Sequence, residues 1–74
     1  EKINFAKKEY DLLLLLFSEP GKLFKRHEIM QKVWGNDSYV GDRTLDVHIR
    51  KLRKKLGENL IITIKGIGYQ INEL

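Results

Sequence analysis

Cysteine is absent from the 74-residue sequence, and proline and methionine occur once each. Without cysteine the chain can form no disulfide and offers no thiolate ligand to a metal ion, which fits a reducing compartment such as the cytoplasm. The longest uninterrupted apolar run covers residues 12–17, whereas a membrane-spanning helix needs about 20 such residues. We therefore expect no membrane partner and a cytoplasmic location.

Catalytic and cofactor-binding motifs are missing as well. His27 and His48 are isolated and lack the spacing of a metal-binding pair. Ser18 and Ser38 have no plausible catalytic base beside them. The "GIG" of residues 66–68 is too short for a dinucleotide-binding fingerprint and is typical of a turn. The sequence thus predicts a protein that is not an enzyme and has no metal or cofactor.

Positive charge is concentrated in one short segment. The whole chain has a formal net charge of +4, yet residues 43–55 alone contain six Lys or Arg residues and one acidic residue. A chain of this length is sufficient for one small domain, residues 1–74. A basic segment this dense predicts a polyanionic partner such as nucleic acid.

Hydrophobic periodicity divides the chain into helices and strands. Pro20 and Gly21 end the first helix, Gly35 and Gly57 end the next two, and Asp42 is a candidate N-cap of the third. Two β-branched runs around "GIG" predict a hairpin. The expected elements are a strand end at residues 1–5, helices at 7–18, 26–34 and 43–56, a short strand at 22–24 and a hairpin at 60–72.

The first predicted helix is apolar on nearly every side. Further apolar surface, from Leu12, Leu15 and Leu16, surrounds its helical stripe, so we expect a buried central helix. The stripe with the i, i+3, i+4, i+7 spacing consists of Tyr10, Leu13, Leu14 and Phe17.

The third predicted helix separates into faces at about 100° per residue. Asp46 and Arg53 lie on one flank, and His48 and Lys55 lie on the other. The apolar stripe that must face the core consists of Leu45, Ile49, Leu52 and Leu56. The opposite side consists of basic residues around one valine: Arg43, Val47, Arg50, Lys51 and Lys54.

Two residues of this helix each leave two interpretations open. A single exposed valine needs no explanation, but Val47 in a DNA major groove can contact a thymine methyl group. Asp46 can accept a hydrogen bond from cytosine N4, or it can pair with Arg50 one turn later. An outward valine and carboxylate favour sequence-specific binding over an architectural, sequence-indifferent DNA binder. The basic face argues against a module that serves only protein contacts.

Three longer segments carry a resemblance to a known family. They are "EYDLLLLLFSEPGKLFKR" (residues 9–26), "VWGNDSYVGDRTLDVHIRKLRKKLG" (33–57) and "IKGIGYQI" (64–71). These segments resemble the C-terminal effector domain of OmpR/PhoB-type two-component response regulators, and the resemblance covers nearly the whole chain. It implies an α+β winged helix-turn-helix fold with three helices and a C-terminal β-hairpin wing. It also implies bacterial transcription regulation within phosphorelay signal transduction.

The resemblance further implies how single residues contact DNA. The third helix would enter the major groove, and the wing would reach the adjacent minor groove at Lys65, where the family often has arginine. Base contacts are expected from Asp46, Val47, Arg50 and Lys51. Phosphate contacts are expected from Trp34, Arg43, Thr44, His48, Arg53, Lys54, Thr63 and Tyr69. Two of these have an alternative structural role, because Trp34 can cap the core and Tyr69 can pack against the hairpin.

Partners and departures follow from the same resemblance. We expect double-stranded DNA with direct repeats, a tandem dimer on that DNA, a receiver domain in the full-length protein, and RNA polymerase at a loop. The N-terminal sheet of the family is expected to be largely missing, which would leave part of the first helix uncovered. Ala6 and Lys25 replace the usual Ser or Thr helix caps, at a cost of about 1 kcal/mol each. Lys7 and Lys8 are mildly unfavourable at the positive end of the first helix's dipole, which Glu9 partly offsets. The polymerase loop comprises Ser38, Tyr39, Val40 and Gly41.

Overall fold

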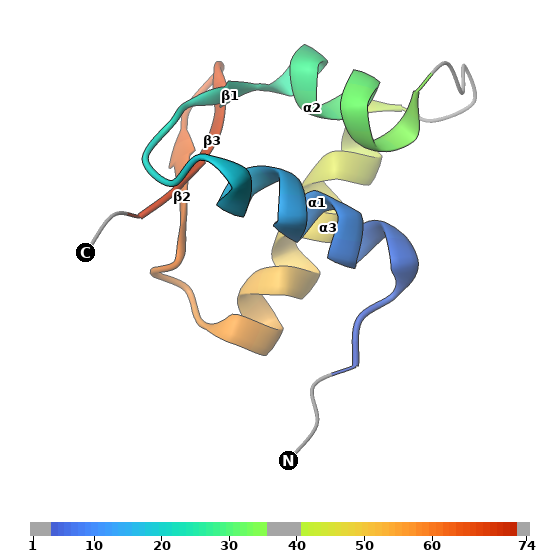
Figure 1. The fold of residues 1–74 in the computed structure, drawn as a ribbon, viewed down its shortest axis with the longest axis vertical. Coiled ribbons are helices and arrows are strands. Elements are labelled where there is room, and N and C mark those ends of the chain that lie inside the picture. Colours follow the sequence, from blue (N-terminus) through green and yellow to red (C-terminus); the bar gives the residue numbers. More distant parts are fainter. Residues whose placement is uncertain (1–3, 36–40, 73–74) are drawn as a thin grey trace.

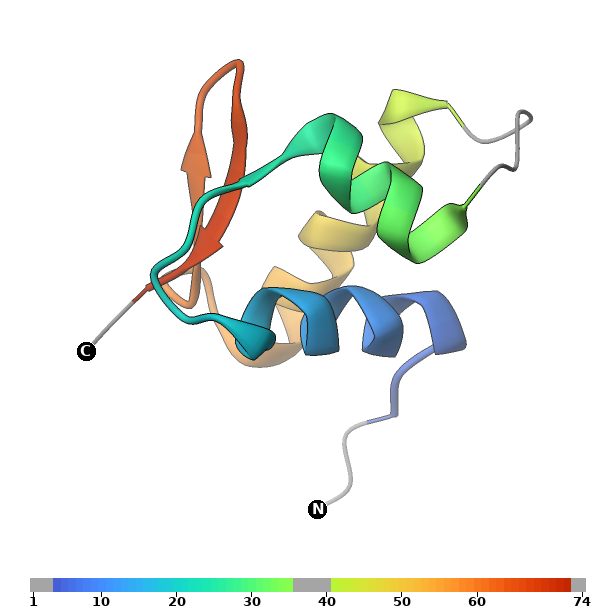
Figure 2. The same ribbon diagram turned by 45° about the horizontal axis from the view of Figure 1, so that its top comes forward.

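The computed structural model describes residues 4–35 and 41–72, and within them three helices lie beside a three-stranded sheet (Figure 1). This arrangement confirms the predicted α+β winged-helix fold. The hairpin lies to one side of the helices, as Figure 2 also shows. In chain order the elements are α1 (Lys7–Ser18), β1 (Phe24–Lys25), α2 (Arg26–Trp34), α3 (Asp42–Leu56), β2 (Ile61–Ile64) and β3 (Gly68–Ile71).

The sheet is antiparallel, with β3 between β1 and β2. Tyr69 of β3 pairs with Phe24 on one side and Thr63 on the other. Glycine is required at position 68 of β3, because a Cβ atom there would lie 1.9 Å from the carbonyl oxygen of Phe24 in β1. The short strand predicted at residues 22–24 is found instead at Phe24–Lys25, so the two share only Phe24.

The helix boundaries agree closely with the sequence pattern. Gly35 and Gly57 end α2 and α3, and each donates its amide to a carbonyl four residues earlier. The N-cap assigned to Asp42 is wrong, because Asp42 is already helical and Gly41 occupies the cap. Gly41 is extended, and its carbonyl accepts the Thr44 amide at 3.0 Å. Residues 1–3 of the expected strand end lie outside the described residues, and residues 4–6 form no strand.

The first turns of α1 and α2 have only half of a capping box. Ala6 and Lys25 provide no side-chain cap, as expected. The Glu9 Oε1 atom accepts the Ala6 amide at 3.1 Å, and Glu28 Oε1 accepts the Lys25 amide at 3.4 Å. Each glutamate therefore satisfies the N-cap amide and adds negative charge at the positive end of its helix.

The core contains residues from every element, but α1 contributes to it through a different face than expected. Tyr10, Leu14 and Phe17 are 50%, 52% and 43% exposed, so they do not form the core stripe. Leu12 and Leu16 are fully buried, because α2, α3 and β3 all pack against that side. The buried apolar residues are Leu12, Leu16, Phe24, Ile29, Val33, Leu45, Ile49, Leu52, Ile61, Tyr69 and Ile71.

Two further expectations are tested by the packing. On α3 the predicted core stripe is confirmed for Leu45, Ile49 and Leu52, whereas Leu56 at the helix end is only partly buried. Leu15 is partly buried as well, so the residues expected to lack cover are not the exposed ones. Across residues 4–35 and 41–72, no helix has both the length and the apolar character needed to cross a membrane.

Candidate nucleic-acid interface

The side of α3 opposite its core stripe is exposed, and we call it the outer face. Val47 is 46% exposed at its centre. None of the four surrounding cations forms an ion pair or a side-chain hydrogen bond with another described residue. The outer face comprises Arg43, Val47, Arg50, Lys51 and Lys54. It therefore presents four cations that form no ion pair with a described residue, around one apolar side chain.

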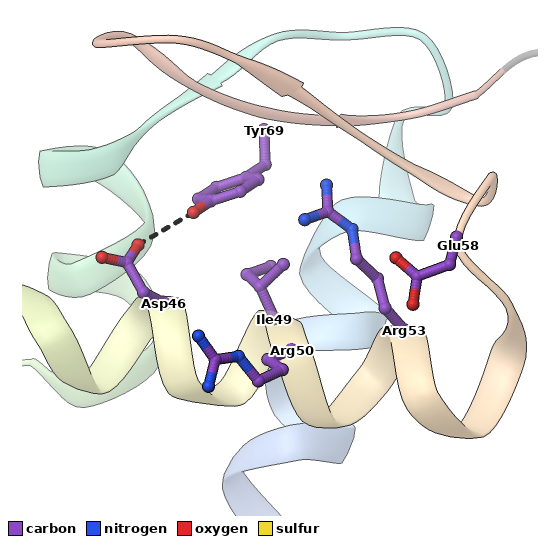
Figure 3. A pocket seen from close by; sticks show the side chains of 6 residues that line it. All are labelled: Asp46, Ile49, Arg50, Arg53, Glu58 and Tyr69. Atoms are coloured by element: carbon purple, nitrogen blue, oxygen red, sulfur yellow. Dashed lines mark hydrogen bonds between the residues drawn. The ribbon is translucent and has the colours of Figure 1, made fainter.

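The Asp46 flank of α3 faces the sheet and α2. Asp46 Oδ1 accepts hydrogen bonds from Arg26 Nη1 at 2.7 Å and from the Tyr69 hydroxyl at 2.8 Å. Figure 3 shows Tyr69 extending from the wing toward α3 with its hydroxyl directed at Asp46. The alternative pairing of Asp46 with Arg50 is therefore wrong: the carboxylate binds Arg26 of the neighbouring helix instead.

The electrostatics of this cluster fix its protonation. The Arg26 hydrogen bond, with a smaller contribution from that of Tyr69, holds the pKa of the Asp46 carboxyl below its ordinary value, although partial desolvation acts in the opposite direction. Burial, and then the hydrogen bond to Asp46, raises the pKa of the Tyr69 phenol. Asp46 is consequently ionised at neutral pH, and both of its partners keep their protons.

Arg53 lies on the same flank, nearer the end of α3. Its Nη2 atom donates to the Ile61 carbonyl at 2.7 Å and to Thr63 Oγ1 at 2.6 Å. Its guanidinium carbon lies 5.9 Å from the centre of the Tyr69 ring, and Figure 3 shows the side chain reaching toward the wing. Its Nε atom is buried without a hydrogen-bond partner among the described residues. Arg53 thus connects α3 to both strands of the hairpin.

The opposite flank packs against the other two helices. His48 Nδ1 lies 2.7 Å from the Thr44 carbonyl, and its ring meets Trp34 edge-on with 5.1 Å between centroids. Because a carbonyl can only accept, Nδ1 carries the proton in this arrangement. Trp34 is partly buried against the core, which agrees with its capping role. Lys55 Nζ donates to buried Glu9 at 2.6 Å, linking α3 to α1.

The wing tip and the loop before α3 complete the candidate interface. Lys65 is exposed at the tip, where the Ile67 amide closes the turn on the Ile64 carbonyl at 2.9 Å. Of the expected polymerase-contact residues, Gly41 is exposed, while Ser38, Tyr39 and Val40 lie outside the described residues. Within the part of the chain that the structure describes, no cluster of acidic or histidine residues could hold a metal ion.

Many of the expected site residues therefore fall into one of two groups. The outer-face residues and Lys65 point to solvent, where a ligand can reach them. Arg53, Thr63 and Tyr69 instead bind other parts of the domain. No sequence pattern pointed to Arg26, which is 20 residues from Asp46 along the chain and meets it only in the folded domain.

Comparison with known proteins places the chain in a family. A sequence model of the family described as "Transcriptional regulatory protein, C terminal" matches residues 1–71. The transcriptional regulatory protein CssR of Bacillus subtilis is 44% identical over 69 residues, which cover 93% of this chain and 31% of CssR. The phosphate regulon regulator PhoB of Rhizobium meliloti is 39% identical over 74 residues, covering 95% and 33%. The chain thus spans about a third of the length of these curated relatives.

Solved structures agree with the sequence comparison. The DNA-binding domain of Bacillus subtilis CssR superimposes with a TM-score of 0.85 at 43% identity, covering 93% of this chain and 78% of that one. The DNA-binding domain of AdeR in complex with an intercistronic region gives 0.83 at 35% identity, covering 96% and 78%. DrrB of Thermotoga maritima, an OmpR/PhoB homologue, gives 0.85 at 29% identity, covering 99% and 35%. The chain belongs to the family of C-terminal domains of transcriptional regulatory proteins, as a winged-helix effector domain of the OmpR/PhoB response-regulator type.

Proposed function

We propose that this domain regulates transcription in a bacterial two-component system by binding specific DNA sequences. In this proposal α3 enters the major groove and the β2–β3 hairpin reaches the adjacent minor groove. The observation that carries it is the outer face of α3, where four cations that form no ion pair with a described residue surround the exposed Val47. Unpaired cations attract phosphates, whereas a valine adds nothing to phosphate binding and can contact a thymine methyl group.

Base recognition is assigned to the centre of the outer face. Val47 is proposed to meet thymine methyl groups, and Arg50 and Lys51 to donate to guanine O6 and N7. Lysine lacks the planar fork of arginine, so the contact from Lys51 is less directional. Asp46 differs from these three, because its Oδ1 atom is already bound by Arg26 and Tyr69.

Phosphate contacts are assigned to the periphery of the same surface. Arg43 and Lys54 are exposed at opposite ends of the outer face, and Lys65 at the wing tip is positioned for the adjacent minor groove. Thr44 and His48 lie on the flank toward α2 and are partly buried. Trp34, Arg53, Thr63 and Tyr69 stay predicted phosphate contacts, although the last three already bind within the domain.

Partners beyond a single duplex are proposed from the family. We expect tandem dimers on direct-repeat DNA and a receiver domain elsewhere in the full-length protein. Residues 38–41 are proposed to contact RNA polymerase. A regulator that binds the bacterial chromosome would act in the cytoplasm.

Site selection from a random duplex library, followed by salt-titrated binding, tests the proposal. We expect one enriched motif and a binding constant that falls steeply with salt, because phosphate-bound cations displace counterions. Binding without an enriched motif would support the architectural alternative, in which the outer face contacts only phosphates. Absence of binding even at low salt would contradict both DNA-binding functions.

A further inference from the structure

Two side chains on the sheet-facing flank of α3 attach the wing to the helix that is proposed to read DNA. Asp46 holds β3 through Tyr69 and also holds α2 through Arg26. Arg53 holds β2 through the Ile61 carbonyl and Thr63. We propose that Asp46 is a positioning residue, which fixes the wing relative to α3 so that both can engage DNA together, rather than a base-reading residue.

The geometry of the carboxylate supports this assignment. Both of these hydrogen bonds end on the same oxygen, Oδ1, at 2.7 and 2.8 Å, and one donor carries a full positive charge. Charge-assisted bonds of this length are among the stronger contacts that a surface-proximal side chain can make. Using Oδ1 to read a base would compete with a contact that joins α2, α3 and β3.

A substitution of Tyr69 can distinguish a positioning role of Asp46 from base reading. Its side chain is 6% exposed, and its ring packs within the core. Its hydroxyl serves Asp46, and it also lies 3.5 Å from Arg26 Nη1. Removing this single oxygen loosens the connection between α3 and β3 and leaves the outer face intact. A loss that came only from the predicted phosphate contact of Tyr69 would instead add to the loss caused by Asp46→Asn.

A fixed wing matters for the proposed two-groove binding, and this inference rests on that proposed function. If helix and wing are held in register before association, ordering them on DNA costs less conformational entropy. If the connection is loosened, each element can still bind, but their joint placement must be established during binding. Loss of the connection should therefore lower affinity without altering which base pair any one outer-face residue contacts.

The test is a double-mutant cycle of Asp46→Asn and Tyr69→Phe, measured on the duplex that site selection enriches most with the parent chain. Each single variant should weaken binding by about three- to tenfold, because asparagine keeps the acceptor oxygen but loses the charge that strengthens its hydrogen bonds, and phenylalanine lacks the donor. The double variant should bind no more weakly than the weaker single variant, because both changes break one connection. The matched controls are Asp11→Asn and Tyr10→Phe on α1, whose side chains lie outside the interface and should leave affinity unchanged.

Several results would overturn the inference. Base reading predicts that Asp46→Asn alters the preference at one base pair while Tyr69→Phe selects the parent motif. A purely structural role predicts lower thermal midpoints for both variants, with parental affinity at temperatures where both are folded. Additive losses in the double variant would also contradict a shared connection. If the parent enriches no motif and binds no duplex, the proposed function fails and this inference fails with it.

Discussion

Helices α1 and α3 are both rich in leucine, yet only one of them reveals its faces in the sequence. On α3 the charges alternate with apolar residues, and the predicted core stripe is confirmed at Leu45, Ile49 and Leu52. On α1 the run of residues 12–17 presents apolar side chains in every direction, and the fold buries Leu12 and Leu16 while exposing Leu14. The contrast teaches that charged residues define the orientation of a helix better than apolar residues do.

The largest expected effect comes from the two sides of α1. Leu12→Ala should lower the free energy of unfolding by about 2–5 kcal/mol, because the fully buried side chain leaves a cavity. Leu14→Ala should change it by no more than about 0.5 kcal/mol, since that side chain is 52% exposed. Urea denaturation of both variants measures the difference. Equal losses would mean that the exposed side of α1 is covered in solution.

The second expected effect concerns the ion pair that joins the two helices. Glu9 is 3% exposed and binds Lys55 Nζ at 2.6 Å, and this hydrogen bond is the main cause that lowers its pKa below the ordinary 4.5. Glu9→Gln retains the shape and removes the charge, so it should cost about 1–3 kcal/mol at neutral pH. Urea denaturation at pH 7 measures this loss, with the exposed Glu19→Gln as its control.

The lowered pKa of Glu9 also fixes the sign of the pH dependence. A carboxyl group that holds its proton less tightly in the folded state stabilises the fold above its unfolded-state pKa. That contribution disappears as the pH falls from about 4.5 through the lower folded-state pKa. The parent should therefore lose its advantage over Glu9→Gln in this acidic range. An advantage that stays constant from pH 7 to pH 3 would contradict the pairing.

Much of this architecture follows from local pattern, whereas the connections between elements do not. Gly35 and Gly57 mark helix ends because a glycine readily adopts the backbone conformation needed there. The helical periodicity of α3 correctly placed Asp46 and Arg53 on one flank, but it did not predict which elements that flank would contact. The partners of Asp46 are 20 and 23 residues away along the chain, so only the packing of α2 and β3 brings them together.

The third prediction compares two residues of the outer face in DNA binding. Arg43→Ala should weaken binding to all duplexes similarly and reduce the salt slope by about one, because it removes a phosphate contact. Val47→Ala should weaken binding by about 1 kcal/mol, and only at sites with thymine at the contacted position. Titrations against the selected duplex and a thymine-substituted variant provide the measurement. Equal losses on every sequence would remove the base-contact role of Val47.

The smallest expected effect is a gain at the start of α1. Ala6 has an extended backbone, with φ −66° and ψ 155°, which is the conformation of an N-cap residue, but its side chain cannot accept a hydrogen bond. Ala6→Ser adds that acceptor and completes the capping box with Glu9, so it should raise the free energy of unfolding by about 0.5–1 kcal/mol. Ala6→Gly, which adds no side-chain acceptor, is the matched control in urea denaturation. DNA affinity should not change, because the substitution leaves every side chain of the outer face of α3 in place. A gain in stability accompanied by a change in affinity would instead show that the start of α1 and the proposed DNA surface are coupled through Glu9 and Lys55.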